Sequence, residues 1–345
     1  MIDLRSDTAT KPSAAMREAM ANAEVGDEQR REDPTVNELE RLAAELLGQE
    51  EAVYLPTATM ATQIALRILT TPGQEVLAEE SSHIFGAELG GAAVHSGLAQ
   101  RSIESADGRF TPEQVRAKLR DWGSFHTPAT TLLVVEDTHN SSGGRYWRLD
   151  ELDAVAAAAR ELNLKLHLDG ARIFNGAVAR GLPVADFARH FDTVSICLSK
   201  GLGAPLGALV AGSAELMHEA RWNKHLFGGA MRQAGIVAAG GLYALRHNVE
   251  RLADDHARAR RLAEGIAAQG IHVRLDTVET NFVQIDVGPD RSAVLKRLRE
   301  HGVMLSTTIH PTVVRAVTHL DVTDDDIDQA IERIPQALAA ERVRA

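Results

Sequence analysis

Cysteine, aromatic residues and excess positive charge are all scarce in this sequence of 345 residues. The single cysteine, Cys197, excludes a disulfide within the chain, and its place in an apolar run predicts a small buried side chain. Aromatic residues make up only 4% of the chain while alanine is abundant, which favours helices packed on a sheet. The net charge of −11 argues against a nucleic-acid partner, because no basic surplus is available to meet phosphates.

Long hydrophobic runs are also absent. No apolar stretch approaches the roughly 20 residues that a membrane-spanning helix needs, and the first residues lack the pattern of a signal peptide. We therefore expect a cytoplasmic protein without a membrane span. The hydrophobic content of 44% and charged content of 25% are ordinary for a globular protein, and the length suits one large domain with a smaller one.

Strand and helix patterns alternate through the middle of the chain, which predicts a largely parallel sheet covered by helices on both faces. The last of the predicted strands follows its neighbour too closely for a helical crossover, so we expect it to be antiparallel. The predicted strands are 52–55, 75–78, 131–135, 165–168, 194–198 and 206–211. The helical patterns between them lie near 59–70, 84–93, 112–120, 150–162 and 213–222.

The two ends of the chain do not show this regular alternation of strand and helix patterns. Helices are expected from Pro12 and from Asp33 to Gly48, and 230–268 is almost wholly helical with a break near His247-Asn248. Beyond Gly270 the pattern changes to that of a small α+β lobe, with strands at 273–274, 281–287 and 313–318 and helices at 291–301 and 323–339. These patterns predict an N-terminal segment (1–14), a large domain (15–248) and a small C-terminal domain (249–345).

A lysine follows one of the predicted strands. The run 194–198 ends at Ser199-Lys200, and glycines and a proline come directly after it. An apolar run bounded by such breakers predicts a buried strand ending in a loop, where glycines let a ligand approach closely. A lysine in this setting suits Schiff-base chemistry. Taken alone, the segment fits a surface lysine equally well.

Polar side chains follow the other predicted strands, at the edge where open parallel sheets bind ligands. After the first strand, Ala58 and Thr59 open a helix whose free N–H groups form an anion site, although Thr59 could simply cap that helix. His83 follows the second strand, where a cap or surface role is the alternative. Asp169 ends the fourth strand, and a buried carboxylate there needs a protonated ring nitrogen or Arg172 as its partner.

These groups match the needs of pyridoxal phosphate. The cofactor takes a helix N-terminus for its phosphate, a stacking partner for its ring, a carboxylate for its pyridine nitrogen and a lysine for its aldehyde. Lys200 follows Asp169 by about thirty residues, roughly one strand–helix–strand unit, so one site can hold both.

Six motifs are spread along nearly the whole chain: Asp3-Leu4-Arg5-Ser6-Asp7-Thr8, Asp33-Pro34-Thr35-Val36-Asn37, Glu136-Asp137-Thr138-His139-Asn140, His167-Leu168-Asp169-Gly170-Ala171-Arg172, Ser199-Lys200-Gly201-Leu202-Gly203 and Gly228-Gly229-Ala230-Met231-Arg232-Gln233-Ala234-Gly235. In type and order they resemble those of the low-specificity L-threonine aldolases, which are pyridoxal-phosphate enzymes of the aspartate-aminotransferase fold (fold type I). The resemblance implies a mostly parallel seven-stranded sheet in an α/β large domain, with a smaller α+β C-terminal domain.

The resemblance also implies roles for individual residues. Lys200 would hold the cofactor, Asp169 would pair with its pyridine nitrogen and His83 would stack on its ring. The Ala58-Thr59 turn would bind the phosphate, helped by Arg232 from a neighbouring subunit. No metal is expected.

On the substrate side of the implied site, three residues would bind the carboxylate and two histidines would act on the β-hydroxyl. Ser6, Arg172 and Arg315 would bind the substrate carboxylate, since guanidinium groups match carboxylate geometry. His83 would take the proton of the β-hydroxyl, with His126 orienting that hydroxyl. The implied reaction cleaves Cα–Cβ of threonine, allo-threonine or related β-hydroxy-α-amino acids to glycine and an aldehyde.

Three parts of the sequence depart from the family pattern. Arg30-Arg31 stands where the family has Tyr-Gly, Ala87 stands where an aromatic is common, and 58–62 replaces Gly-Thr-Gln-Ala-Asn. We expect these changes to widen the side-chain pocket and make its entrance more positive. A preference for bulkier or acidic substrates and neutral drift of a loop are both open.

Other interpretations remain at this stage. The chain could be another pyridoxal-phosphate lyase or an aminotransferase, or a relative that binds the cofactor without catalysis. The resemblance further implies a homotetramer, a dimer of dimers with shared active sites, acting on a small amino-acid substrate.

Overall fold

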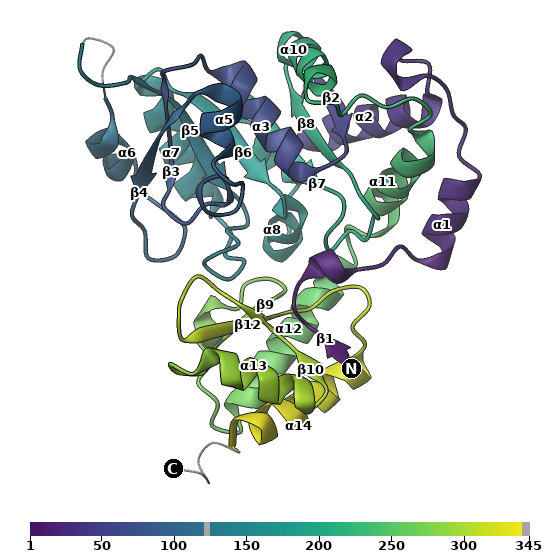
Figure 1. Ribbon diagram of the computed structural model, residues 1–345, viewed down its shortest axis with the longest axis vertical. Helices are drawn as coiled ribbons and strands as arrows, with labels where there is room; N and C mark the ends of the chain where they lie inside the picture. Colours follow the sequence, from purple (N-terminus) through teal and green to yellow (C-terminus); the bar gives the residue numbers. More distant parts are fainter. Residues whose placement is uncertain (121–124, 340–345) are drawn as a thin grey trace.

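The computed structural model describes residues 1–120 and 125–339. Its larger lobe is built on a seven-stranded sheet (Figure 1). Neighbouring strands in the middle of the sheet are parallel, while β8 pairs antiparallel with both β7 and β2. In sheet order the strands are β2 (Glu51–Leu55), β8 (Ala208–Gly212), β7 (Thr193–Cys197), β6 (Lys165–Gly170), β5 (Thr130–Glu136), β3 (Glu75–Glu79) and β4 (Ala99–Ile103). The mostly parallel seven-stranded sheet is thus confirmed.

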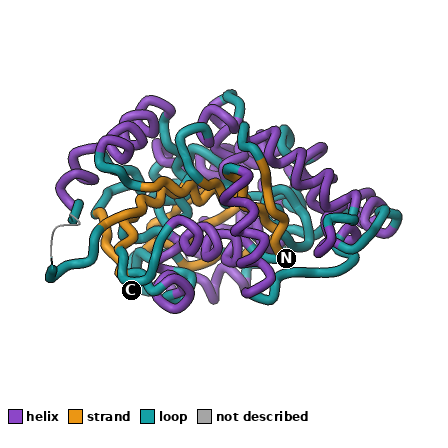
Figure 2. The backbone as a smooth tube through the Cα atoms, turned by 90° about the horizontal axis from the view of Figure 1, so that it is seen from above, coloured by secondary structure: helices purple, strands orange, loops and turns teal. Residues whose placement is uncertain are grey.

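Nearly continuous apolar strands fit this sheet because both of its faces are covered (Figure 2). In β5, Leu133 and Val135 point into one core cluster while Leu132 and Val134 point into another, as the two-residue period of a strand requires. The first face packs against α2 (Pro34–Leu47), α6 (Pro112–Lys118), α7 (Leu149–Glu161), α8 (Ile173–Arg180), α9 (Val184–Ala188) and α11 (Gly235–His247), with α1 (Ala14–Ala21) on α11. The second packs against α3 (Ala58–Leu69), α4 (His83–Gly86), α5 (Gly91–Ser96) and α10 (Ala214–Leu226).

Among the described residues, the smaller lobe holds an antiparallel sheet and three helices. Its strands are β9 (Phe282–Asp286), β12 (Val313–Val317) and β11 (Ser306–Thr307), and its helices are α12 (Leu252–Ala267), α13 (Arg291–Glu300) and α14 (Asp324–Ala339). The N-terminus belongs to this lobe, because β1 (Ile2–Asp3) pairs in parallel with β10 (Val303–Met304). From there the chain passes to α1 in the larger lobe (Figure 1). Short 3₁₀ turns lie at Asp7–Ala9, Glu28–Arg30 and Leu275–Thr277.

Several elements differ from the sequence-based expectation. The edge strand β4 was missed because its sequence is polar and half-exposed, so it lacks the apolar run of an interior strand. The helix expected at 84–93 divides into α4 and α5, because Leu89 and Gly90 adopt positive φ angles of 54° and 73°. The segment 230–234 is not helical, whereas the expected break near His247-Asn248 separates α11 from α12.

The division of the chain at 248/249 stays a prediction. Of the described helices, none is both long and apolar enough to cross a membrane.

Candidate active site

The carboxyl ends of the parallel strands bring the predicted polar residues to one edge of the sheet. Asp169 lies near the end of β6, Lys200 follows β7, and His83 follows β3. Glu136, the last residue of β5, is the register partner of Asp169. Because β2 runs in the same direction as β7, α3 also begins at this edge. Residues that are remote in sequence therefore meet at the position where such sheets bind ligands.

His83 and Asp169 face one another across this edge. One ring nitrogen of His83 and carboxylate oxygens of Glu88 and Asp169 all lie within 4.8 Å of one another. A divalent cation could use such a spacing, but Nδ1 of His83 already contacts Glu88 Oε1 at 2.8 Å. The second oxygen of Glu88 accepts from Gln63 Nε2 at 2.6 Å, so this buried carboxylate is committed to holding the imidazole.

The partnership with Glu88 also sets the protonation of His83. Its hydrogen bond raises the pKa of His83 above the ordinary value, against the opposing effect of burial, and the negative charge of Asp169 acts in the same direction. In the neutral form, Nδ1–H donates to Glu88, which leaves Nε2 as the ring atom able to accept a proton.

Two arginines from different lobes meet at a single amide oxygen. Nη1 of Arg172 and Nη1 of Arg315 donate to Oδ1 of Asn140 at 3.2 and 3.0 Å. Both guanidinium groups also lie over the ring of Phe282, at 5.0 and 5.4 Å from its centroid. Burial and the charge of Arg172 lower the pKa of Arg315. Such a concentration of positive charge is suited to an anion.

Arg172 is only partly available to a ligand. Its Nε and Nη2 donate to the two carboxylate oxygens of Asp7, both at 2.7 Å, in a buried bidentate pair. Burial would raise the pKa of Asp7, but the charge and hydrogen bonds of Arg172, with the charge of Lys200, lower that pKa to about 2. The N-terminal segment thus reaches the site through Asp7, a residue that the sequence argument did not assign.

The start of α3, where the sequence predicts an anion site, is capped by a different residue from the one considered. The N-cap is Thr57, whose side chain accepts from the N–H of Met60 at 3.2 Å. Ala58 and Thr59 occupy the first helical turn with no intrahelical partner for their N–H groups. The alternative that Thr59 caps the helix is wrong, and Thr59 is an exposed residue at this edge.

The structure places three further predicted site residues, Ser6, Arg232 and His126, in different surroundings. Ser6 accepts from the N–H of Thr8 and precedes Asp7, so it lies at the site. Arg232 is exposed and pairs with Asp27 at 3.1 Å. The exposed His126 precedes β5, whose length of about 20 Å separates it from the carboxyl edge. Within one chain, His126 therefore does not join the other predicted residues.

The residues that depart from the family pattern at Arg30-Arg31 and Ala87 lie in different parts of the structure. Arg31 lies within 3.9 Å of Glu51, the first residue of β2 and thus at the opposite edge of the sheet, while Arg30 lies near Asp27. Arg31 therefore does not line the site of its own chain, and the expected positive entrance stays a prediction. Ala87 ends α4, the helix that His83 begins, and its methyl group is exposed.

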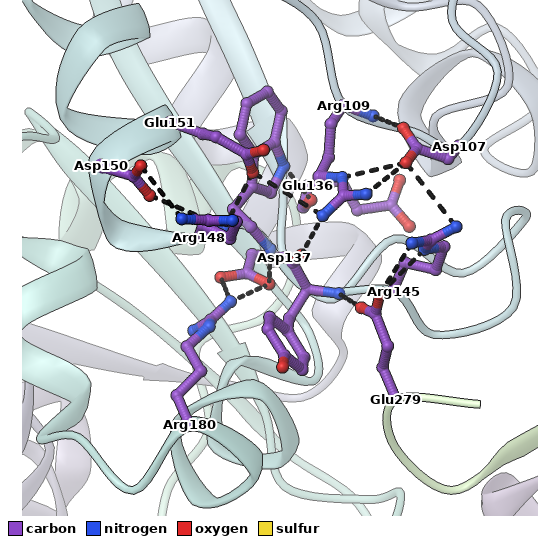
Figure 3. A network of polar contacts seen from close by, with 12 residues as sticks. Asp107, Arg109, Glu136, Asp137, Arg145, Arg148, Asp150, Glu151, Arg180 and Glu279 are labelled. Carbon is purple, nitrogen blue, oxygen red and sulfur yellow. Dashed lines mark hydrogen bonds and ion pairs between the residues drawn. The ribbon is translucent and has the colours of Figure 1, made fainter. Parts of the chain in front are cut away.

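A network of ion pairs fixes the loop that follows β5 (Figure 3). The buried Asp137 accepts two hydrogen bonds from Arg180, at 2.6 and 2.8 Å. Arg145 donates to Glu279 of the smaller lobe at 2.8 Å, and Glu279 also accepts from the N–H of Tyr146 at 3.0 Å. The loop that carries Asn140 is therefore tied to both lobes.

The donor set fits pyridoxal phosphate. Lys200 supplies an amine, Asp169 a carboxylate, His83 an aromatic ring beside that carboxylate and the start of α3 a phosphate cradle. Sequence reasoning had not assigned the supporting residues Asp7, Glu88, Glu136 and Asn140. Of these, Asp7, Glu136 and Asn140 stood inside the quoted motifs, and that was the available signal.

Comparisons with known proteins agree with this geometry. Residues 3–288 match the beta-eliminating lyase family. The chain is 42% identical to the low specificity L-threonine aldolase of Escherichia coli (strain K12), covering 95% of this chain and 96% of that protein. It is 39% identical to the probable low-specificity L-threonine aldolase 2 of Arabidopsis thaliana, covering 96% and 95%. A threonine aldolase structure from Leishmania major shares the fold with a TM-score of 0.85 at 21% identity, covering 98% of this chain and 100% of that one.

Proposed function

This chain belongs to the low-specificity L-threonine aldolases of the beta-eliminating lyase family, and from that premise we propose the reaction it catalyses. It is a pyridoxal-phosphate-dependent carbon–carbon lyase that cleaves L-threonine, L-allo-threonine and related β-hydroxy-α-amino acids to glycine and an aldehyde. The observation that carries this proposal is the meeting of Lys200, Asp169, His83, Arg172 and Arg315 at one sheet edge.

In this proposal, different residues of the chain bind the cofactor and the substrate. Bound pyridoxal phosphate supplies the covalent link to the substrate amine and a sink for the electrons of the broken bond. Lys200 would hold it, Asp169 would pair with its ring nitrogen, and the start of α3 would bind its phosphate. Ser6, Arg315 and the remaining nitrogen of Arg172 hold the substrate carboxylate, which fixes the orientation of Cα.

His83 is the base in this proposal. Its Nε2 takes the proton of the β-hydroxyl, because Glu88 occupies Nδ1. His126 and Arg232 act in the site of a neighbouring copy, since His126 is remote from its own site. The enzyme is then a homotetramer with shared sites. Exposed apolar side chains, among them Trp222 of α10 and Val94 of α5 (66% and 75% exposed), support an interface. The cytoplasmic location stays a prediction.

The site also bears on side-chain preference. The methyl group of Ala87 leaves room where the family commonly carries a ring, which supports a preference for bulkier aldehydes. Arg31 lies beside Glu51 at the opposite edge of the sheet, so within one chain it gives no support for a preference for acidic substrates. A panel of L-threonine, phenylserine and β-hydroxyaspartate compared by kcat/KM tests this preference, and clear superiority of threonine would refute it.

Replacing the cofactor lysine tests the proposed function. In Lys200→Ala, we expect glycine formation from L-threonine to fall by about 10³-fold or more, because the amine that holds the cofactor is gone. The matched control is Lys165→Ala, which removes an exposed lysine at the other end of β6 and should leave the rate within about twofold. A Lys200→Ala enzyme with undiminished aldehyde release, or a parent that releases none, contradicts the proposal. Glutamate formation from 2-oxoglutarate at a comparable rate would favour the aminotransferase alternative.

A further inference from the structure

Glu136 joins two segments of the site that are far apart in sequence. Its Oε2 accepts from the backbone N–H of His83 at 2.8 Å, and its Oε1 accepts from the backbone N–H of Asn140 at 2.8 Å. The residue is 6% exposed. Each carboxylate oxygen therefore accepts from a different part of the site.

The two segments serve opposite ends of the substrate site. His83, whose N–H donates to Glu136, begins α4, and its imidazole faces Asp169. The N–H of Asn140 belongs to the residue whose Oδ1 lies between Arg172 and Arg315. Under the proposed function, the first end would receive the cofactor ring and the second the substrate carboxylate.

We propose that Glu136 is a positioning residue that fixes the cofactor-ring end of the site relative to the carboxylate-binding end. The inference rests on the proposed function and adds a role for a carboxylate that accepts from two backbone N–H groups of the site. A carboxylate suits the task, because its two equivalent oxygens serve two donors at once. Misplacement of either end by as little as 1 Å is costly, by about 10²-fold in rate.

The variant Glu136→Gln tests the proposal directly. Glutamine has one acceptor oxygen, and its NH₂ group would face the second backbone N–H, so one link must break and leave a buried donor unsatisfied. Because the remaining link can only partly hold the geometry, we expect both ends to loosen. The holoenzyme should release pyridoxal phosphate about tenfold faster on dilution, and glycine should bind about tenfold more weakly, as followed by cofactor absorbance.

A remote carboxylate supplies the matched control. Glu40 is 5% exposed and accepts from the backbone N–H of Tyr54 at 2.9 Å, on the face of the sheet that α2 covers. We expect Glu40→Gln to lower the melting temperature while cofactor release and glycine binding stay within twofold. The control therefore separates loss of a buried carboxylate as such from loss of this one.

Asn140→Asp examines one end alone. The substitution keeps the N–H that bonds to Glu136 and places a carboxylate between the two arginines, where it competes with a substrate carboxylate. We expect glycine binding to weaken by about tenfold while cofactor release stays within twofold. Asn22→Asp adds the same charge at the exposed end of α1 and should change neither.

The outcomes distinguish failure of the Glu136 proposal from failure of the proposed function. A folded Glu136→Gln enzyme in which both constants change supports the proposal, and one in which either constant stays within twofold of the parent overturns it. An Asn140→Asp enzyme with unchanged glycine binding also counts against it. Cleavage of L-threonine by the parent tests the proposed function separately, because the role of Glu136 is judged on ratios of binding and release measured without turnover.

Discussion

Glu88 determines what the imidazole of His83 can do. It occupies Nδ1 and raises the pKa of His83, so the base is protonated and inactive at a higher pH than an isolated histidine would be. The rate of cleavage should therefore rise with pH as His83 loses its proton. The position of that rise depends on the charge of Glu88.

Removing this charge should move the acid limb of the pH profile. In Glu88→Gln, the pKa of His83 falls, so we expect the acid limb of kcat/KM for L-threonine to shift to lower pH. Glu45→Gln, which alters an exposed pair with Arg41 on α2, is the control and should leave the profile in place. A limb that stays where it is, or moves to higher pH, would contradict the assignment of His83 as the base.

Asp7 and Arg172 illustrate a buried pair whose removal is costly. In Asp7→Asn the guanidinium stays buried without its counter-charge, and we expect the free energy of unfolding to fall by about 3 kcal/mol. The pKa of Asp7 is lowered to about 2, so its contribution to stability is complete above its ordinary value and is lost as the pH falls toward 2. The variant should lack this part of the acid sensitivity.

Urea denaturation at several pH values measures both effects. Asp3→Asn is the control, because Asp3 forms an exposed pair with Arg5 whose loss should cost less than about 1 kcal/mol. Equal losses in the two variants would show that burial of the Asp7 pair has no special weight.

The first turn of α3 is the element on which the phosphate proposal depends. Helix N-termini attract anions because their N–H groups are unpaired and the helix dipole is positive there. In Thr59→Asp, the new carboxylate would occupy this field and repel a phosphate. We expect release of pyridoxal phosphate to accelerate by about tenfold or more, while stability changes by less than about 1 kcal/mol.

A second helix offers the matched change. Ser292 is the second residue of α13, is exposed, and lies in the smaller lobe away from the site. Ser292→Asp should have the same small effect on stability and none on cofactor release. If both variants, or neither, release the cofactor faster, the start of α3 is not the phosphate site.

At the scale of the whole molecule, the proposal that sites are shared predicts complementation. Lys200→Ala and Arg232→Ala chains should each be poorly active as pure oligomers. When the two chains are co-expressed, some sites combine an intact Lys200 from one chain with an intact Arg232 from its neighbour, and activity should reappear. If Arg232 serves its own chain's site, no mixed oligomer can be active.

The mass of the oligomer is a separate measurement. Four chains of 37.3 kDa give about 150 kDa, and light scattering on the holoenzyme should report that value. Two chains would also allow shared sites, but they would contradict the tetramer.

Much of the larger lobe followed from the sequence alone. Apolar runs such as 131–135 predicted interior strands because both of their faces are buried, and the short link to 206–211 predicted its antiparallel direction. The polar edge strand β4 could not be predicted in this way, since half of its surface faces solvent and its sequence carries no strand period.

For the site, sequence determined which chemistry was present and tertiary structure decided how it is held. Lys200, Asp169 and His83 could be identified because parallel strands end at one edge, a rule that requires only local pattern. The supporting residues Glu88, Glu136 and Asn140 could not, because each acts through contacts that loop paths and lobe packing create. The distance of His126 from the site, by contrast, follows from its place before the strand predicted at 131–135, because a residue at the start of a parallel strand lies opposite the carboxyl edge.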